Sequence, residues 1–153
     1  MSWPGLESKP SPIAGTGLFA TQVFTSGQKL LPYLGKVIDS PPRSAPGQPT
    51  FILEIKPGVW IDGQTENNLA RFANHSCAPN AELVFDEEQK EAWLIARQTI
   101  PVGEEITFDY GFSLAESLFH PCQCGQANCV GKIIASPLRP ALLRHLRFSR
   151  PRD

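Results

Sequence analysis

The sequence predicts one mostly β domain with a few small helices. Its 153 residues are a typical length for a single domain. Fifteen prolines and twelve glycines divide the chain into short apolar runs, a pattern of strands and turns rather than of long helices. No apolar run approaches the roughly 18 residues that cross a membrane, and the opening MSWPGLESKP lacks a secretory pattern. We therefore expect an intracellular protein without a membrane segment.

The N-terminal half is expected to consist of strands separated by turns. Glycine and proline mark those turns because they permit or fix backbone conformations that strands do not use. In chain order, the expected segments are a lead-in (1–8), short strands that break at Ser26-Gly27 (15–38), a proline-rich loop (40–49) and a hairpin whose strands (50–55 and 59–61) flank Pro57-Gly58.

The C-terminal half is expected to add two short helices and a second hairpin. Thr65 is a candidate N-cap for a helix over 65–74, with Leu69, Phe72 and Ala73 on one face. The remaining segments are, in order, a hairpin (81–86 and 91–100), an extended run (104–112), a cysteine-rich stretch (120–133) and a basic tail (135–153) in which Pro140 begins a short helix.

Charge is distributed unevenly along the chain. Residues 1–136 carry nine Lys/Arg and fourteen Asp/Glu, a net charge of −5, whereas residues 137–153 carry five Arg and one Asp, a net charge of +4. An acidic body attracts a basic partner over long range. An ordinary acidic surface with a solvated basic tail is the alternative. Because basic and aromatic residues do not interleave on the body, direct nucleic-acid binding is not expected.

The segment GTGLFA, residues 15–20, matches the G-x-G-x-x-G/A pattern of dinucleotide sites, and Asp39 lies about 20 residues further on. That pattern must follow a strand and open a helix, so that the helix N-terminus meets the pyrophosphate. Here prolines precede it and β-branched residues follow it. A dinucleotide site is therefore not expected, and the two glycines serve a tight turn or a close backbone approach.

The four cysteines suggest a zinc site. Cys122, Cys124 and Cys129 form a C-x-C-x4-C pattern that can curl around one ion. Structural zinc has four ligands, and Cys77 is the only cysteine left to supply the fourth. Four free cysteines, or His75 or His120 as fourth ligand, are the alternatives. A zinc ion here would attach the C-terminal segment to the loop around Cys77.

Several motifs together resemble those of the SET-domain lysine methyltransferases with a C-terminal post-SET zinc module. They are RFANHSCAPN, GEEITFDYGF and CQCGQANCVGKI, supported by GTGLFA and YLGKVI. The resemblance implies a SET domain over 9–112 and a post-SET zinc segment over 113–134. It implies a fold of several small sheets with a C-terminal pseudoknot, which would bring residues 74–77 beside 104–112.

The same resemblance implies roles for individual residues. Three residues would be catalytic. Tyr110 would align and polarise the reacting groups, the Tyr33 hydroxyl would bond the lysine nitrogen, and Phe108 would leave room for a methylated amine. Contacts to the donor would come from a further set, namely Gly15, Gly17, Leu18, Phe19, Asn74, His75 and Gln123. A purely structural role is the alternative for His75. Glu104, Glu105 and Asp109 would attract substrate, or are solvated charges at strand edges.

The function implied is that of a protein-lysine N-methyltransferase. It would use S-adenosyl-L-methionine to modify a lysine-rich tail, histone or histone-like, to the di- or trimethyl state, with Zn²⁺ as a structural ion. A catalytically silent, zinc-stapled module that binds protein tails is the alternative. The location expected is cytoplasmic in a bacterium and nuclear in a eukaryote.

Overall fold

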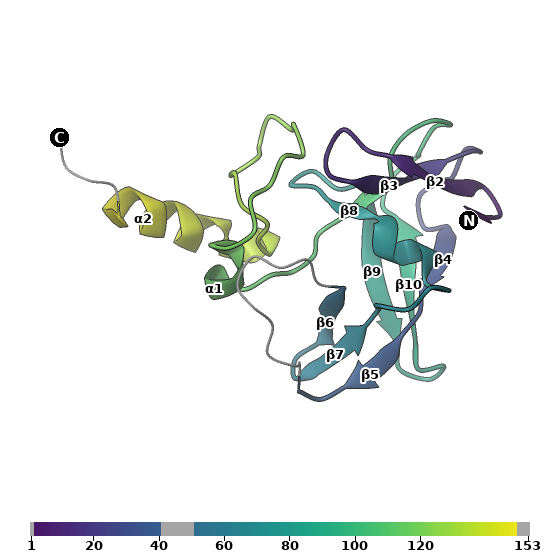
Figure 1. The fold of residues 1–153 in the computed structure, drawn as a ribbon, viewed down its shortest axis with the longest axis horizontal. Coiled ribbons are helices and arrows are strands. Elements are labelled where there is room, and N and C mark those ends of the chain that lie inside the picture. The colour runs from purple at the N-terminus through teal and green to yellow at the C-terminus, as the bar shows by residue number, and fades with distance from the viewer. Residues whose placement is uncertain (1, 41–50, 150–153) are drawn as a thin grey trace.

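The computed structural model describes residues 2–40 and 51–149, and there the chain forms four small β-sheets with short helices (Figure 1). This confirms the mostly β fold. The three larger sheets have the strand orders β1-β2-β3, β4-β10-β9 and β5-β7-β6, and the smallest pairs β11 with β8. No helix in this part of the chain has the length and apolar character needed to span a bilayer.

The strands that form the first sheet begin earlier than the sequence suggests. Strands β1 (Ser2–Trp3) and β2 (Leu6–Pro10) lie where residues 1–8 were expected to be a lead-in. Strand β2 pairs antiparallel with β3 (Thr16–Ala20), which places Leu6 opposite Ala20 in the core. The prolines obscure this strand in the sequence, but Pro10 lies at its last position, where a proline is tolerated.

Both predicted hairpins are present. Strands β6 (Ile52–Lys56) and β7 (Val59–Asp62) flank Gly58, whose positive φ of 78° suits the turn. Strands β9 (Ala81–Asp86) and β10 (Glu91–Ala96) form the second hairpin. Strands β4 (Lys29–Tyr33) and β5 (Lys36–Ile38) complete two of the sheets. The loop predicted over 40–49 lies outside the described residues, except for its first residue.

The helix predicted over 65–74 is a single 3₁₀ turn, Leu69–Phe72, and Thr65 does not cap it. The Asn68 side chain instead accepts from the Leu34 amide at 2.9 Å and donates to the Gly63 carbonyl at 3.0 Å. These bonds connect the turn to neighbouring strands. The backbone then becomes extended at Ala73, which leads into strand β8 (Asn74–His75). Tertiary hydrogen bonds have therefore overridden the local helical pattern.

Only Thr107–Phe108 of the run 104–112 forms a strand, β11. It pairs parallel with β8, so Thr107 lies opposite Asn74 and Phe108 opposite His75. The predicted proximity of 74–77 and 104–112 is confirmed. The Asn80 side chain supports the pair by accepting from the Thr107 amide at 2.9 Å and donating to the Glu105 carbonyl at 2.8 Å.

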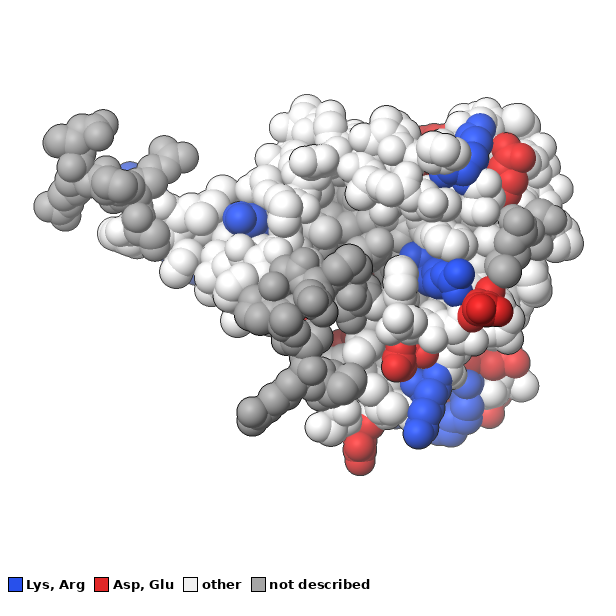
Figure 2. Space-filling model, in the orientation of Figure 1, with Lys and Arg blue, Asp and Glu red and all other residues white. Residues whose placement is uncertain are grey.

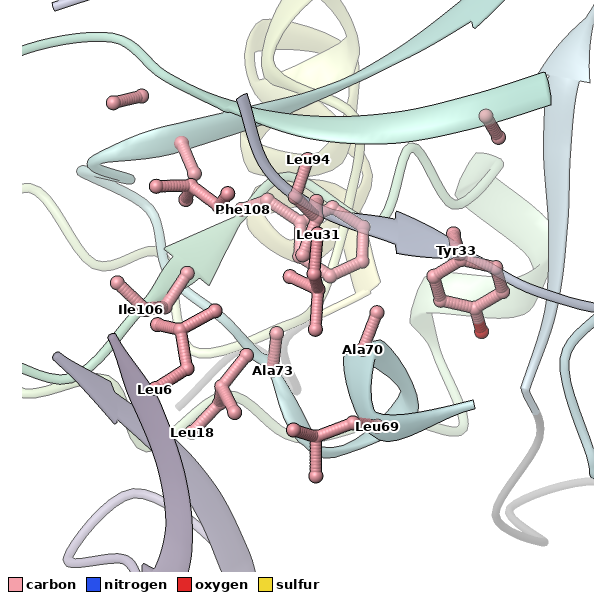
Figure 3. Packing of buried hydrophobic residues seen from close by; sticks show 14 of the residues in the cluster. Leu6, Leu18, Leu31, Tyr33, Leu69, Ala70, Ala73, Leu94, Ile106 and Phe108 are labelled. Atoms are coloured by element: carbon pink, nitrogen blue, oxygen red, sulfur yellow. The ribbon is translucent and has the colours of Figure 1, made fainter. Parts of the chain in front are cut away.

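One hydrophobic core joins these sheets (Figure 3). Leu18 from β3, Leu94 from β10 and Ile106 from the segment before β11 are fully buried. Ala70 and Ala73 pack against them from the 3₁₀ turn and its exit. The core therefore holds the 3₁₀ turn, and through it strand β8, in a fixed position.

The C-terminal segment contains helices α1 (Leu114–Ser117) and α2 (Arg139–Ser149), and α2 extends away from the sheets (Figure 1). Ser113 and Glu116 cap α1 reciprocally. Helix α2 begins at Arg139, with Pro140 in its first turn, where proline fits. Leu142 is completely buried, whereas Phe148 is 84 % exposed, so only the first half of α2 is anchored.

The face of the molecule that Figure 2 shows carries no continuous acidic field over its described residues. On the face drawn in Figure 2, basic and acidic side chains lie beside each other. Exposed pairs include Lys56 with Glu87 at 3.0 Å and Lys9 with Glu7 at 3.5 Å. A basic partner would therefore meet mixed charges at this face, while the net charge of residues 1–136 still acts at long range.

Replacing Leu94 by alanine should lower the free energy of unfolding by about 2–5 kcal/mol, because it removes a fully buried side chain that the core cannot refill. The matched control is Val84→Ala on the neighbouring strand β9, where the side chain is exposed and the expected loss is below about 1 kcal/mol. Urea unfolding followed by circular dichroism measures both. Equal losses would contradict this account of the core.

Candidate active site and metal centre

A cavity of about 530 Å³ lies between the β-sheets and the C-terminal segment. Its volume suits a small organic ligand. Four parts of the chain line it, namely the loop 13–16, the 3₁₀ turn with strand β8, the segment of Tyr110 and Phe112, and the stretch 120–123. These parts are far apart in sequence, and the pairing of β8 with β11 brings two of them together.

A second, much narrower cavity adjoins the first. Its lining consists of Tyr33, Phe51, Leu53, Arg71, Ala73, Phe108 and Tyr110. Three residues, Phe51, Arg71 and Tyr110, line both cavities, so together they form the boundary between the two spaces. The three aromatic residues predicted to be catalytic are therefore together at the narrow cavity.

Hydrogen bonds fix the two tyrosine hydroxyls. The Tyr110 hydroxyl donates to the Ala73 carbonyl at 2.7 Å, and the Tyr33 hydroxyl donates to the Phe51 carbonyl at 2.8 Å. Burial raises the pKa of both tyrosines well above the ordinary value, helped by Glu105 at Tyr110 and by Tyr110 and Asp62 at Tyr33. Both hydroxyls therefore remain protonated at neutral pH and act as hydrogen-bond donors rather than as bases.

Phe108 is fully buried beside Tyr110, and their ring centroids are 4.9 Å apart. Phe112 lies on another side of Tyr110, with centroids 5.6 Å apart, and it lines the large cavity. A phenyl ring at position 108 leaves one wall of the narrow cavity without a hydrogen-bonding group.

Asn74 and His75 both line the large cavity. The Asn74 amide donates to the Ala14 carbonyl at 3.1 Å and to the Glu105 carboxylate at 2.9 Å, which orders the loop beside the cavity. Burial lowers the pKa of His75 to about 4 although the nearby Asp109 opposes the shift, so the ring is neutral at pH 7. Its Nδ1 accepts from the Tyr110 amide at 3.1 Å.

The proton of this neutral imidazole is therefore on Nε2, and that buried atom has no hydrogen-bond partner among the described residues. A buried polar donor without a partner is costly. Its presence at the wall of the cavity fits a ligand that offers an acceptor. The cavity and this donor are together compatible with a polar cofactor such as S-adenosyl-L-methionine.

The other residues expected to contact a donor divide into two groups. Gly15 and Gln123 line the large cavity. Gly17, Leu18 and Phe19 are buried in strand β3 and do not line it, so their contact with a donor stays a prediction. A side chain at Gly17 would meet Glu105 Oε2 at 2.7 Å, so close packing favours glycine there.

Glu105 is a supporting residue and not a surface charge. Its carboxylate accepts from the Ser11 hydroxyl at 2.8 Å and from Asn74. Sequence reasoning also passed over Ile13, Ala14, Phe72 and Arg71, which line the large cavity. Arg71 and Phe72 belong to the RFANHSC motif, and that motif indicated that they lie near the site. Nothing in the sequence singles out Ile13 and Ala14 besides their proximity to Gly15.

The four cysteines form one cluster, as predicted. The sulfur atoms of Cys77, Cys122, Cys124 and Cys129 all lie within 4.8 Å of one another, and Cys77 and Cys122 are 3.9 Å apart. Tetrahedral zinc with Zn–S bonds of about 2.3 Å requires sulfur atoms roughly 3.8 Å apart. The donor set and spacing therefore fit a Zn²⁺ ion. Neither His75 nor His120 belongs to the cluster.

Burial and hydrogen bonds shift the pKa values of three of these cysteines in different directions. Burial raises the pKa of Cys77 and of Cys122. Burial acts in the same direction on Cys124, but hydrogen bonds from the backbone of Cys77 and Gln126 and from neighbouring thiols outweigh it and lower its pKa to about 6. Four thiolates this close repel one another unless a metal neutralises them. Because Cys122 also lines the large cavity, the metal centre and the cavity share a wall.

Comparison with known proteins places these features in one family. The SET domain family matches residues 15–111. Similar curated proteins include the H3 lysine-36 specific histone-lysine N-methyltransferase of Yarrowia lipolytica, 34 % identical over 76 % of this chain, and the H3 lysine-4 specific enzyme of Schizosaccharomyces pombe, 33 % identical over 80 %. The chain spans only 16 % and 14 % of their lengths.

A solved structure shares the arrangement of the elements. It is described as KRYPTONITE in complex with mCHH DNA, an H3(1-15) peptide and SAH, and it aligns with a TM-score of 0.67 and 28 % identity over 84 % of this chain and 29 % of its own. Since the family match covers more than half of the residues and the fold agrees, the chain belongs to the SET domain family.

Proposed function

We propose that the protein is an S-adenosyl-L-methionine-dependent protein-lysine N-methyltransferase. The observation that carries this proposal is the position of Tyr110 between a cavity of cofactor size and a narrow aromatic cavity. Transfer of a methyl group from a large donor to a lysine side chain needs two such spaces that meet at one point. Of the three residues that line both spaces, Tyr110 is the one with a hydroxyl, and it would align donor and acceptor.

The relatives support the choice of substrate. The two curated relatives are histone-lysine N-methyltransferases, specific for H3 lysine 36 and H3 lysine 4, and the solved structure contains an H3 peptide and SAH. We infer that this chain acts on a lysine in a histone or histone-like tail. In a eukaryote this would take place in the nucleus.

The large cavity would hold the donor, which supplies an electrophilic methyl group on a sulfonium centre. Asn74, His75, Gly15 and Gln123 are the predicted contacts that line it. The buried Nε2 donor of His75 would find its acceptor there. Phe72, Phe112 and Ile133 add apolar surface that excludes water, which protects the reactive methyl from hydrolysis.

The narrow cavity would receive the amine end of the lysine side chain. Its volume of about 10 Å³ is room for a single water, so it must widen as the lysine enters. A lysine amine must lose its proton before it can attack, although its ordinary pKa is about 10.4. Desolvation between Tyr33, Phe108 and Tyr110 lowers that pKa, as does approach to a cationic donor. The two protonated tyrosine hydroxyls then orient the neutral amine rather than deprotonate it.

We further propose that the enzyme forms di- or trimethyl-lysine. Phe108 supports this because it has no hydroxyl to hold the amine or a water in the narrow cavity. A methylated nitrogen can therefore rotate and present its lone pair again. The Zn²⁺ site would fix the segment 120–124 against strand β8 and so complete the donor cavity.

Tyr110→Phe should reduce methyl transfer by about 10²–10⁴-fold, the range typical of a lost positioned acid–base or hydrogen-bonding group, while donor binding persists. Transfer is measured as tritium passed from labelled S-adenosyl-L-methionine to a histone mixture, and binding by calorimetry. Wild-type protein that binds the donor but methylates no basic protein would favour the silent tail-binding module instead.

Phe108→Tyr should shift the product from higher methylation states to monomethyl-lysine, because the added hydroxyl would occupy space and restrain the amine. Mass spectrometry of the modified peptide gives the product distribution. Phe112→Tyr is the matched control, since it adds the same group beside Tyr110 but on the donor side. If the two variants give the same distribution as wild type, position 108 does not set the product.

Cys77→Ser should abolish stoichiometric zinc, because one ligand of the tetrahedral set is lost. Purified wild-type protein should carry close to one equivalent, measured by inductively coupled plasma mass spectrometry. His120→Asn should retain it, since His120 lies outside the cluster. Zinc retained in Cys77→Ser and lost in His120→Asn would overturn the four-cysteine assignment.

A further inference from the structure

The stretch from Ala135 to Arg139 lies beyond the family match at residues 15–111. It contacts both the segment that carries Tyr110 and the loop that carries Cys77. The Ala135 amide donates to the Phe112 carbonyl at 2.9 Å, and the Ser136 amide donates to Asp109 Oδ2 at 2.8 Å. These bonds join this stretch to the segment that carries Tyr110.

Asp109 connects Ser136 to the backbone that follows Tyr110. Its second oxygen, Oδ1, accepts from the Gly111 amide at 2.8 Å, so one carboxylate holds residues on both sides of Tyr110. Gly111 has a positive φ of 73°, which a chain adopts readily only at glycine. The backbone at Tyr110 is thereby bent toward strand β8, where its amide meets His75.

Arg139 contacts the loop that carries Cys77, next to the cysteine cluster. Its Nη2 donates to the Cys77 carbonyl at 2.6 Å, and Asn128 Nδ2 donates to the same oxygen at 2.9 Å. Arg139 is the first residue of α2, and the helix is fixed to the body by the fully buried Leu142. Arg139 is therefore held in position by a helix that packs against the rest of the protein.

External support matters here because β8 and β11 are only two residues long. So short a pair supplies few ladder hydrogen bonds, and a parallel ladder is slightly less stable per residue than an antiparallel one. Alignment for a transfer reaction tolerates misplacement of only fractions of an ångström. The strands by themselves do not provide that precision.

We propose that the segment Ala135–Arg139 is a brace that positions Tyr110 for catalysis by way of Asp109. Asp109 and Arg139 are positioning residues, since neither lines the two cavities. Only the expected effect on catalysis rests on the proposed function. The mechanical part, that residues 135–139 hold Tyr110 in place, can be tested without turnover.

Position 136 allows a test that removes a single hydrogen bond. Ser136→Pro deletes the amide proton that Asp109 accepts. Ser136 begins the 3₁₀ turn Ser136–Leu138, where proline fits, and Ala135 before it is extended (φ −55°, ψ 132°), as a residue preceding proline prefers. Ser136→Ala is the matched control, because it retains the amide.

Hydrogen exchange tests the mechanical part in the full-length protein. In Ser136→Pro, the amides of Tyr110 and Gly111 should exchange about tenfold faster or more, the equivalent of losing one hydrogen bond to a charged group, while the amide of Leu94 is unchanged. Ser136→Ala should behave as wild type. Unchanged exchange at Tyr110 and Gly111 in Ser136→Pro would overturn the brace.

Kinetics test the consequence. Ser136→Pro should lower kcat for methyl transfer about tenfold, with zinc content and the dissociation constant of S-adenosyl-L-methionine unchanged. A variant that merely loosened the whole protein would lose all three together, and that result would overturn a positioning role. A wild type without transfer activity would overturn the proposed function alone, since the exchange result still decides the brace.

A second pair keeps the proposal testable if proline impairs folding. Asp109→Asn retains one acceptor oxygen and should give the same selective loss. Asp86→Asn makes the same chemical change in the turn after β9, where Asp86 Oδ1 accepts from the amides of Glu88 and Gln89. Equal kcat in these two variants would contradict the proposal.

Discussion

The pairing of β8 with β11 is the interaction on which the site depends. It places Asn74 opposite Thr107 and His75 opposite Phe108, and so joins segments that are 33 residues apart. Features of both the cavity and the cysteine cluster lie within a few residues of this pair. Tyr110 follows β11, Cys77 follows β8, and the large cavity lies beside both. A site built in this way has no local precursor in the sequence.

Buried side-chain amides and carboxylates hold the surrounding backbone in place of regular secondary structure. Asn68 connects the 3₁₀ turn to the strand β4 exit, Asn80 supports β11, and Glu105 connects Asn74 to the loop at Ser11. Each bond satisfies a group that would otherwise be buried without a partner, which would be costly. The fold therefore uses polar contacts where its strands are too short to form long ladders.

The parts of the structure that could be predicted are those whose cause is local. The hairpin at Gly58 follows from a turn residue between apolar runs, and the cysteine cluster follows from ligand chemistry and spacing. The helix expected at Thr65 was wrong because Asn68 is engaged by distant strands. Gly17, Leu18 and Phe19 were expected at the cofactor cavity but do not line it, because motif adjacency does not reveal which residues of a buried strand reach a cavity.

The order in which the chain can fold follows from the parallel pair and its distant supports. Contacts between residues far apart in sequence close large loops and so form slowly. Strands β9 and β10 are neighbours along the chain and can associate early, whereas the large cavity needs residues 120–123 and its brace needs residue 139. The buried residues of the core all lie between Leu6 and Phe112, so the core can assemble without the segment that completes the large cavity. We therefore expect the cavity to be completed after the core, when residues 120–123 pack against it.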